Sequence, residues 1–166
     1  MKLNYISPVG NLAIRIQKGR LTELTLSDGS ALGKSNPDLN EECPENRALA
    51  EQIIAQLDEY FAGKRKEFDL PLSLDGTDFQ KKVWHELQQI PYGQAISYKE
   101  LSSRVKGNPN ASRAVGNANG KNPVAIIVPC HRVIAHDGSL GGYSLGLEMK
   151  KKLLKLEAIE CSKPLK

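Results

Sequence analysis

Residues 97–119, SYKELSSRVKGNPNASRAVGNAN, hold two short helical patterns separated by a turn. Ser97 and Glu100 form a capping box, which predicts the start of the first helix. The segment GNPN at 107–110 combines glycine, asparagine and proline and predicts a turn. A second helix is expected over 111–119, with small residues on one side. This order predicts a helix-turn-helix, whose second helix can lie in a groove of DNA.

The residues around this motif continue the helical pattern. Thr77 and Gln80 form another capping box, and the apolar stripe that follows ends at Pro91. The apolar run VAIIV at 124–128 predicts a buried extended segment. A final amphipathic helix is predicted over 145–160. Its expected inward residues are Leu147, Leu153, Leu154 and Leu156, and its lysines expected to face solvent or phosphate are Lys150, Lys151, Lys152 and Lys155.

The first part of the chain has a different pattern. LAIRI at 12–16 and LTELTL at 21–26 alternate apolar and polar residues, which predicts strands with one buried face. A helix is expected at about 45–62. We therefore predict an α+β protein of two domains. Residues 1–75 would form a small antiparallel sheet with a helix, and residues 76–166 a helical domain with the helix-turn-helix.

The charge distribution and the composition limit the classes of partner and the location that we expect for this protein. Residues 1–75 carry 9 basic and 12 acidic side chains, whereas residues 76–166 carry 14 and 7, so the net charge of +4 is the sum of −3 and +7. A basic second domain favours an anionic partner such as nucleic acid. No run of about 18 apolar residues and no signal-peptide pattern is present, so we expect no membrane span and a cytoplasmic location.

The cysteines argue against disulfides and structural zinc. There are three of them, Cys43, Cys130 and Cys161, an odd number without CxxC spacing. We expect neither a metal nor a cofactor, and we interpret Cys43 and Cys161 as small apolar residues. Cys130 differs because VPCHRV at 128–133 places histidine and arginine directly after it.

A reactive cysteine needs its thiolate, which positive potential or a base provides. His131 could act as that base through one water, and Glu157 on the last helix could hold the imidazole. We therefore expect the sulfur to be held ionised. On these residue types alone, a buried structural thiol followed by a loop histidine is the favoured interpretation.

The longer pattern resembles a known family. Asn122-Pro123 stands eight residues before Cys130, and Tyr143-Ser144 begins thirteen residues after it. Together with ISYKELSSRVKGNPNASRAVGNANGKNPV and GGYSLGLEMKKKLLKLE, this pattern is similar to that of the O6-alkylguanine-DNA alkyltransferases over residues 77–158. The resemblance implies a ribonuclease-H-like first domain and a winged helix-turn-helix-like second domain. The absence of a fused zinc domain indicates the stand-alone, constitutive bacterial type.

The resemblance also implies the reaction and the roles of its residues. Cys130 would take the alkyl group from O6-alkylguanine, and from O4-alkylthymine, in a single irreversible turnover. His131 and Glu157 would form the relay to the sulfur, and Tyr98 would donate a hydrogen bond toward guanine N3. Asn122 would tether the active-site turn.

The implied partner is double-stranded DNA, bound through its minor groove by a monomer. Arg113 would fill the gap that the extruded nucleotide leaves in the duplex. The other residues expected to bind DNA or the extruded base are Ala111, Ala114, Gly116, Arg132, Tyr143 and Ser144.

Three alternatives make different predictions. A lesion-binding relative without activity would have another residue, usually tryptophan, in place of Cys130. A helix-turn-helix regulator would bind one DNA sequence and would not react with O6-benzylguanine. A cysteine hydrolase would turn over an ester or a peptide.

Overall fold

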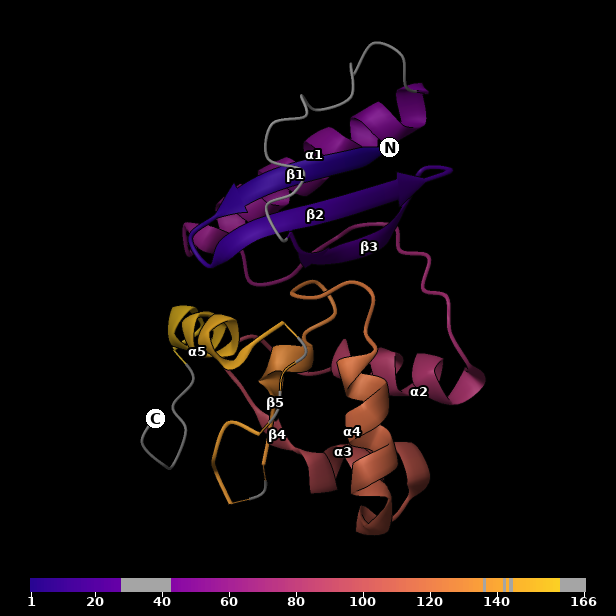
Figure 1. The fold of residues 1–166 in the computed structure, drawn as a ribbon, viewed down its shortest axis with the longest axis vertical. Helices are drawn as coiled ribbons and strands as arrows, with labels where there is room; N and C mark the ends of the chain where they lie inside the picture. Colours follow the sequence, from indigo (N-terminus) through magenta and orange to yellow (C-terminus); the bar gives the residue numbers. More distant parts are fainter. Residues whose placement is uncertain (28–42, 136, 142, 144, 159–166) are drawn as a thin grey trace. The chain divides into compact units, whose positions relative to one another are not determined.

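Two units make up the chain in the computed structural model, Met1–Asp75 and Gly76–Lys166 (Figure 1). The structure describes residues 1–27, 43–135, 137–141, 143 and 145–158. Within these ranges no helix is long and apolar enough to cross a membrane. The predicted α+β architecture is confirmed, since strands dominate the start of the chain and helices follow.

The alternating residues of the first unit form a three-stranded antiparallel sheet in the order β1-β2-β3. Alternate residues of β2, Leu12, Ile14 and Ile16, are buried, whereas Arg15 between them is half-exposed. This is the expected result of side chains pointing to opposite faces of a strand. The strands are β1 (Lys2–Ser7), β2 (Gly10–Gln17) and β3 (Arg20–Leu26).

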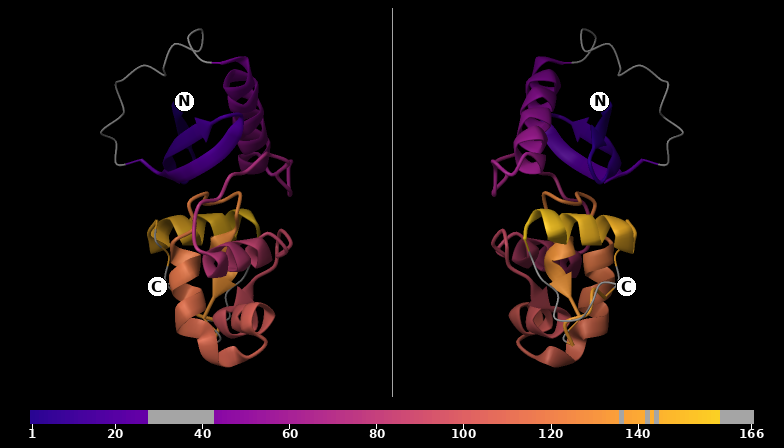
Figure 2. Two further views of the ribbon diagram at one scale, coloured as in Figure 1. Left: turned by 90° about the vertical axis from the view of Figure 1, so that its right-hand side faces the viewer. Right: turned by 90° about the vertical axis from the view of Figure 1, so that its left-hand side faces the viewer.

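One helix, α1 (Pro44–Phe61), covers a single face of this sheet, as both views of Figure 2 show. Its buried stripe includes Leu49, Ile53, Leu57 and Tyr60, spaced three or four residues apart. That spacing puts the four side chains on one side of the helix, toward the sheet. The helix predicted at about 45–62 is therefore confirmed to within one residue at each end.

The second unit begins with the predicted capping box. Thr77 Oγ1 accepts from the backbone N–H of Gln80 at 3.1 Å, and Gln80 Oε1 accepts from the N–H of Thr77 at 3.0 Å. These bonds satisfy donors that a helix start leaves unpaired. The helices and strands that follow are α2 (Asp78–Leu87), β4 (Ile96–Ser97), α3 (Tyr98–Lys106), η1 (Pro109–Ala111), α4 (Ser112–Gly120), η2 (Cys130–Arg132), β5 (Val133–Ile134) and α5 (Leu147–Leu156).

The helix-turn-helix is formed by α3 and α4, with η1 in the turn between them. Gly107 ends α3 at φ +77°, in the left-handed region, and donates its N–H to Ser103 O at 2.9 Å. Behind both helices Trp84 is buried, and its Nε1 donates to Ala118 O at 2.9 Å. This bond ties α2 to α4, so the second helix of the motif has a fixed support.

Two predictions for the last part of the chain are right only in part. Residues 124–128 are buried as predicted, but they form turns rather than an extended strand. In α5, Leu153 and Leu154 are buried as predicted, but Leu147 is 45% exposed and Lys150, which was expected to face outward, is fully buried. The buried side of α5 therefore includes a lysine.

The turn of the helix-turn-helix generates a stability prediction. Gly107→Ala should lower the free energy of unfolding by about 1 kcal/mol, because an alanine at positive φ is strained. Among the described atoms, none lies within 4 Å of the added Cβ, so the strain acts alone. Urea unfolding followed by the fluorescence of Trp84, the single tryptophan, reports on this unit.

The matched control is Gly120→Ala at the end of α4. Its added Cβ likewise meets no described atom within 4 Å, and its φ is not in the left-handed region. We expect it to leave the free energy of unfolding unchanged or to raise it by up to about 1 kcal/mol, because alanine is the better helix former. Equal effects of the two substitutions would contradict the assignment of strain to Gly107.

Candidate active site

The chain reaches Cys130 through two tight turns braced by Asn122. The Asn122 side chain accepts from Val124 N–H at 3.0 Å and donates through Nδ2 to Val128 O at 2.7 Å. Between these bonds Ile126 lies at φ +71°, and the N–H of Ile127 bonds to Ala125 O at 2.8 Å. This is a γ-turn of the rare, strained kind, with a buried β-branched residue at its centre.

A second turn follows at once. The N–H of Cys130 donates to Val128 O at 2.8 Å across Pro129, whose φ of −81° and ψ of 65° fit an inverse γ-turn. Cys130 then starts the 3-10 helix η2. Asparagine and proline therefore fold this segment back on itself, which explains why its apolar residues do not form a strand.

Cys130 is buried, with 2% of its surface exposed. Burial raises the pKa of its thiol, while hydrogen bonds with Asn122 and Tyr143 and the charge of Lys150 act to lower it. The net direction is upward, so the resting sulfur is a neutral thiol. This direction runs against the expectation that the sulfur is held ionised, because desolvation outweighs the local donors and charges. A thiol in this state must lose its proton before the sulfur can act as a nucleophile.

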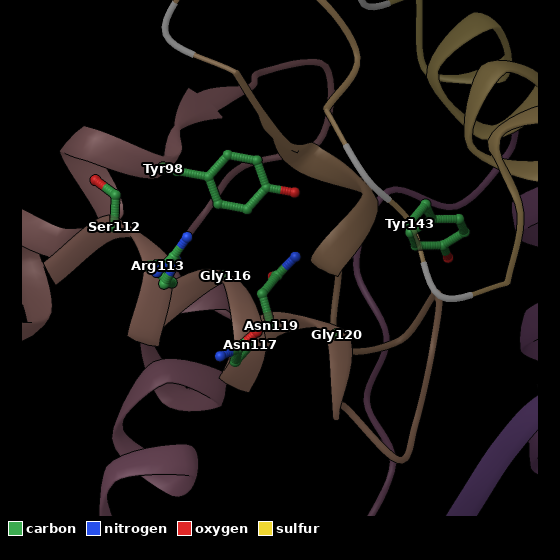
Figure 3. Close-up of a pocket in the computed structure, with 8 residues that line it drawn as sticks. All are labelled: Tyr98, Ser112, Arg113, Gly116, Asn117, Asn119, Gly120 and Tyr143. Atoms are coloured by element: carbon green, nitrogen blue, oxygen red, sulfur yellow. The ribbon is translucent and has the colours of Figure 1, made fainter.

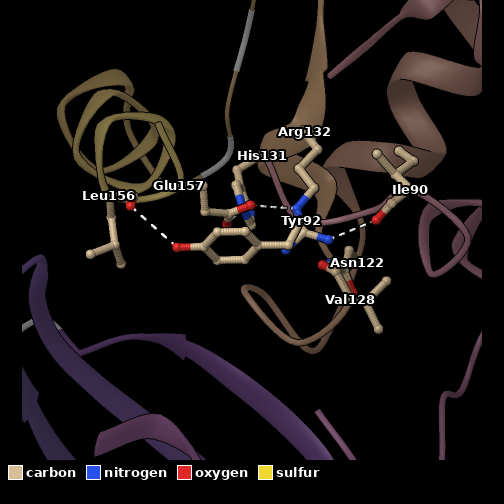
Figure 4. Close-up of polar contacts among 8 residues, drawn as sticks. All are labelled: Ile90, Tyr92, Asn122, Val128, His131, Arg132, Leu156 and Glu157. Carbon is tan, nitrogen blue, oxygen red and sulfur yellow. Dashed lines mark hydrogen bonds and ion pairs between the residues drawn. The ribbon is translucent and has the colours of Figure 1, made fainter. Parts of the chain in front are cut away.

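His131 lies next to this thiol in η2, and its side chain is fully buried. Its Nε2 makes a short hydrogen bond with Glu157 Oε2 (Figure 4). A carboxylate at Nε2 requires the proton there, which leaves the lone pair on Nδ1. Nδ1 is buried and has no hydrogen-bond partner among the residues that the structure describes. Burial lowers the pKa of His131, although Glu157 opposes this, so the imidazole is neutral and can accept a proton at Nδ1.

Glu157 also binds the next side chain of the motif. Arg132 Nε donates to Glu157 Oε1 at 2.6 Å, and Arg132 Nη1 donates to Ile90 O at 2.7 Å (Figure 4). Burial by itself would raise the pKa of the Glu157 carboxyl. Hydrogen bonds and charges of His131 and Arg132 overcome this and hold the pKa at about 2. Both Glu157 oxygens are thus engaged, one by each basic side chain.

A cavity of about 580 Å³ lies along α4 in this unit (Figure 3). Its lining residues come from α3, α4 and the loop before α5: Tyr98, Ser112, Arg113, Gly116, Asn117, Asn119, Gly120 and Tyr143. Burial raises the pKa of Tyr98, so its phenol stays protonated at neutral pH and can donate a hydrogen bond. Cys130 raises the pKa of Tyr98 further, and Tyr143 acts to lower the pKa of Cys130. Asn119, another lining residue, donates through Nδ2 to Cys130 O at 3.4 Å, so the cavity adjoins Cys130.

The residues that the sequence predicted to bind DNA lie in different environments in the structure. Arg113 and Ala114 are exposed on α4, and Gly116 lines the cavity. Ala111 is half-buried at the end of η1. Ser144 lies outside the described residues. Arg132 is 6% exposed and bonded to Glu157 and Ile90, so it lies in the interior, against the expectation that it binds DNA or the extruded base.

Sequence reasoning missed two residues near the sulfur. Asn119 Nδ2 donates to Cys130 O at 3.4 Å and lines the cavity. Lys150 was expected on the surface, yet its charge acts on both Cys130 and His131. The sequence spacing could have revealed its burial, because Lys150 lies three residues before Leu153 and four before Leu154, both of which face inward.

Fold and site together define a helix-turn-helix protein with a buried cysteine, histidine and glutamate at its centre. Residues 78–159 match the family model described as 6-O-methylguanine DNA methyltransferase, DNA binding domain. Residues 3–74 match that of the ribonuclease-like domain of 6-O-methylguanine DNA methyltransferase. The chain therefore belongs to the 6-O-methylguanine DNA methyltransferase family.

Individual relatives are similar to this chain in sequence or structure over most of its length. A methylated-DNA–protein-cysteine methyltransferase of Methanosarcina acetivorans is 50% identical over 125 residues, 75% of this chain and 80% of that protein. One from Methanosarcina barkeri is 45% identical over 151 residues, 91% and 92% of the two chains. The crystal structure of Mycobacterium tuberculosis OGT in complex with DNA has a TM-score of 0.78 at 44% identity, covering 93% of this chain and 90% of that one.

The carboxylate of Glu157, which His131 and Arg132 share, leads to a prediction of how the free energy of unfolding depends on pH. Glu157 has a pKa of about 2 when folded against an ordinary 4.5, so its stabilising effect is complete above pH 4.5 and is lost as the pH falls toward 2. Between pH 7 and pH 3 the free energy of unfolding of the wild type should fall by about 2 kcal/mol more than that of Glu157→Gln. Urea unfolding followed by Trp84 fluorescence measures both, and parallel pH profiles would contradict the depressed pKa.

Proposed function

We propose that this protein repairs DNA by taking the alkyl group of O6-alkylguanine, and of O4-alkylthymine, onto Cys130 in one irreversible step. The observation that carries the proposal is the buried thiol next to a neutral, carboxylate-held imidazole, beside a cavity in a helix-turn-helix unit. Relatives named methylated-DNA–protein-cysteine methyltransferases, at 45 to 50% identity, support it.

The first step is deprotonation of the thiol. The lone pair on His131 Nδ1 accepts the Cys130 proton through one water, and the imidazole becomes positively charged. Glu157 stabilises that charge through its bond to Nε2. Arg132 holds the same carboxylate in place and keeps it ionised. A raised thiol pKa keeps the sulfur unreactive until substrate binds.

The second step is an in-line displacement at the alkyl carbon. A carbon–sulfur bond forms as the bond from carbon to O6 breaks, and the electron pair of that bond goes to the guanine. Tyr98, protonated at neutral pH, donates toward N3 and neutralises the developing charge, and Ser144 would donate toward O6. The proton count is balanced, because His131 holds the proton that left the thiol and the guanine anion gains one proton. The products are a thioether and normal guanine.

The damaged nucleotide must leave the stack to reach a buried thiol. We assign α4 to the minor groove of duplex DNA, where Ala111, Ala114 and Gly116 allow close approach. Arg113, exposed on α4 at the cavity, fills the vacated space. Contacts to phosphate make the affinity salt-dependent and independent of sequence. We further propose that the protein acts as a monomer in the cytoplasm.

Mass spectrometry tests the acceptor. After incubation with duplex DNA containing O6-methylguanine, the wild type should gain one methyl group, located on Cys130 by peptide analysis. Cys130→Ala should gain none. Cys43→Ser is the matched control, since Cys43 is exposed and far in sequence from the site, and it should react like the wild type. Methyl on Cys43, or turnover without a modified protein, would refute the proposal.

Single-turnover kinetics test the role of Arg113. Arg113→Ala should slow methyl transfer from duplex DNA about tenfold or more, because filling the gap offsets part of the unstacking energy. Transfer from free O6-benzylguanine needs no extrusion and should be unchanged. Arg15→Ala, which removes a half-exposed arginine of the first unit, is the control for the loss of one positive charge. Equal slowing with duplex and free base would rule out the assigned role.

A further inference from the structure

Asn119 is a buried polar side chain in the wall of the cavity beside Cys130. It is 4% exposed and lines the cavity together with Tyr98 (Figure 3). An added Cβ at Gly116, one turn earlier on α4, would lie 3.8 Å from Cδ1 and Cε1 of Tyr98. The phenol ring therefore packs against the side of α4 that also carries Asn119.

The protein itself uses both amide hydrogens of Asn119. Nδ2 donates to Cys130 O at 3.4 Å. Burial raises the pKa of the Tyr98 phenol, whereas a hydrogen bond with Asn119 acts to lower it. A partner that lowers the pKa of a phenol donates to its oxygen, so the amide also donates to the Tyr98 hydroxyl. Because an amide nitrogen carries two hydrogens, neither is left for a ligand.

The amide oxygen of Asn119 is in a different state. Oδ1 is buried and accepts no hydrogen bond from any residue that the structure describes. A buried acceptor without a partner costs free energy, and buried polar atoms in proteins are normally satisfied. In the wall of a cavity, such an oxygen indicates a ligand that brings a hydrogen-bond donor.

Guanine carries a donor next to the atom toward which Tyr98 would donate. Its 2-amino group is attached to C2, the ring atom bonded to N3. A base whose N3 faces the Tyr98 hydroxyl therefore brings its amino group to the neighbour of that hydroxyl, Asn119. Thymine has the carbonyl oxygen O2 at the corresponding position, and this oxygen is an acceptor. Two acceptors would then face each other, which disfavours thymine in this cavity.

We propose that Asn119 is a specificity-determining residue for alkyl transfer, whose Oδ1 accepts a hydrogen bond from the 2-amino group of the extruded guanine. This inference rests on the proposed function of Cys130 and on the orientation that Tyr98 gives to the base. It predicts faster transfer from O6-alkylguanine than from O4-alkylthymine. A site built to hydrogen-bond one group of its substrate discriminates against analogues that lack this group.

Single-turnover methyl transfer from duplex DNA tests the contact. The substrates carry O6-methylguanine or O6-methylhypoxanthine, which lacks only the 2-amino group, opposite an abasic site, so that no base pair has to break. The wild type should react at least about tenfold faster with O6-methylguanine. Asn119→Leu should reduce this ratio to within about twofold of one, and it should narrow the gap to O4-methylthymine as well. Asn117→Leu is the matched control, since Asn117 lines the same cavity from α4 but is exposed, and it should keep the wild-type ratio.

The outcomes separate the two proposals. If the wild type takes no methyl group from O6-methylguanine, the proposed function itself fails. If the wild type reacts equally fast with both purines, or if Asn119→Leu slows both by the same factor, Oδ1 does not contact the amino group and the inference is overturned. If Asn119→Leu does not fold, as judged by circular dichroism and Trp84 fluorescence, Asn119→Ala must show the same loss of discrimination, and an unchanged ratio overturns the inference.

Discussion

The active site depends on the compensation of one buried charge, that of the Glu157 carboxylate. It is almost completely buried, and its two oxygens bind His131 and Arg132. A buried carboxylate is stable only when its charge is compensated and its oxygens accept hydrogen bonds. That requirement joins the end of α5 to η2 and, through Arg132 and Ile90, to the segment that follows α2. The position of His131 therefore follows from the assembly of segments far apart in the sequence.

This arrangement changes the expected state of the sulfur. Histidine and arginine after a cysteine suggest a stable thiolate, yet both side chains turn toward Glu157. Burial then dominates, and the resting thiol is neutral beside a neutral base. Under the proposed function the protein is consumed by one reaction, and a neutral buried thiol suits it because such a thiol resists oxidation and stray alkylation. In the proposed mechanism, reactivity requires a substrate in the cavity and proton transfer to His131.

The helix-turn-helix and the cavity share their residues. Tyr98 begins α3, and Arg113 lies in the first turn of α4, so the two helices that would contact DNA also line the space beside the sulfur. Trp84 supports α4 from behind by its bond to Ala118 O. The proposed DNA contacts and the proposed chemistry thus use the same group of packed helices, which suits extrusion of a nucleotide into a nearby site.

Local chemistry determined much of this protein. Alternation defined the sheet, the capping box at Thr77 and the cap at Ser97 defined the starts of α2 and α3, and the spacing from Asn122 through Cys130 to Tyr143 identified the family. These features depend on neighbours within a few residues or on a motif read directly. Three features needed the structure. The turns at 124–128 come from the Asn122 side chain, which is near in sequence but does not show in the apolar pattern. The interior position of Arg132 and the burial of Lys150 are decided by partners distant in sequence, since a shared carboxylate or a backbone carbonyl from another segment determines whether a polar group can leave water.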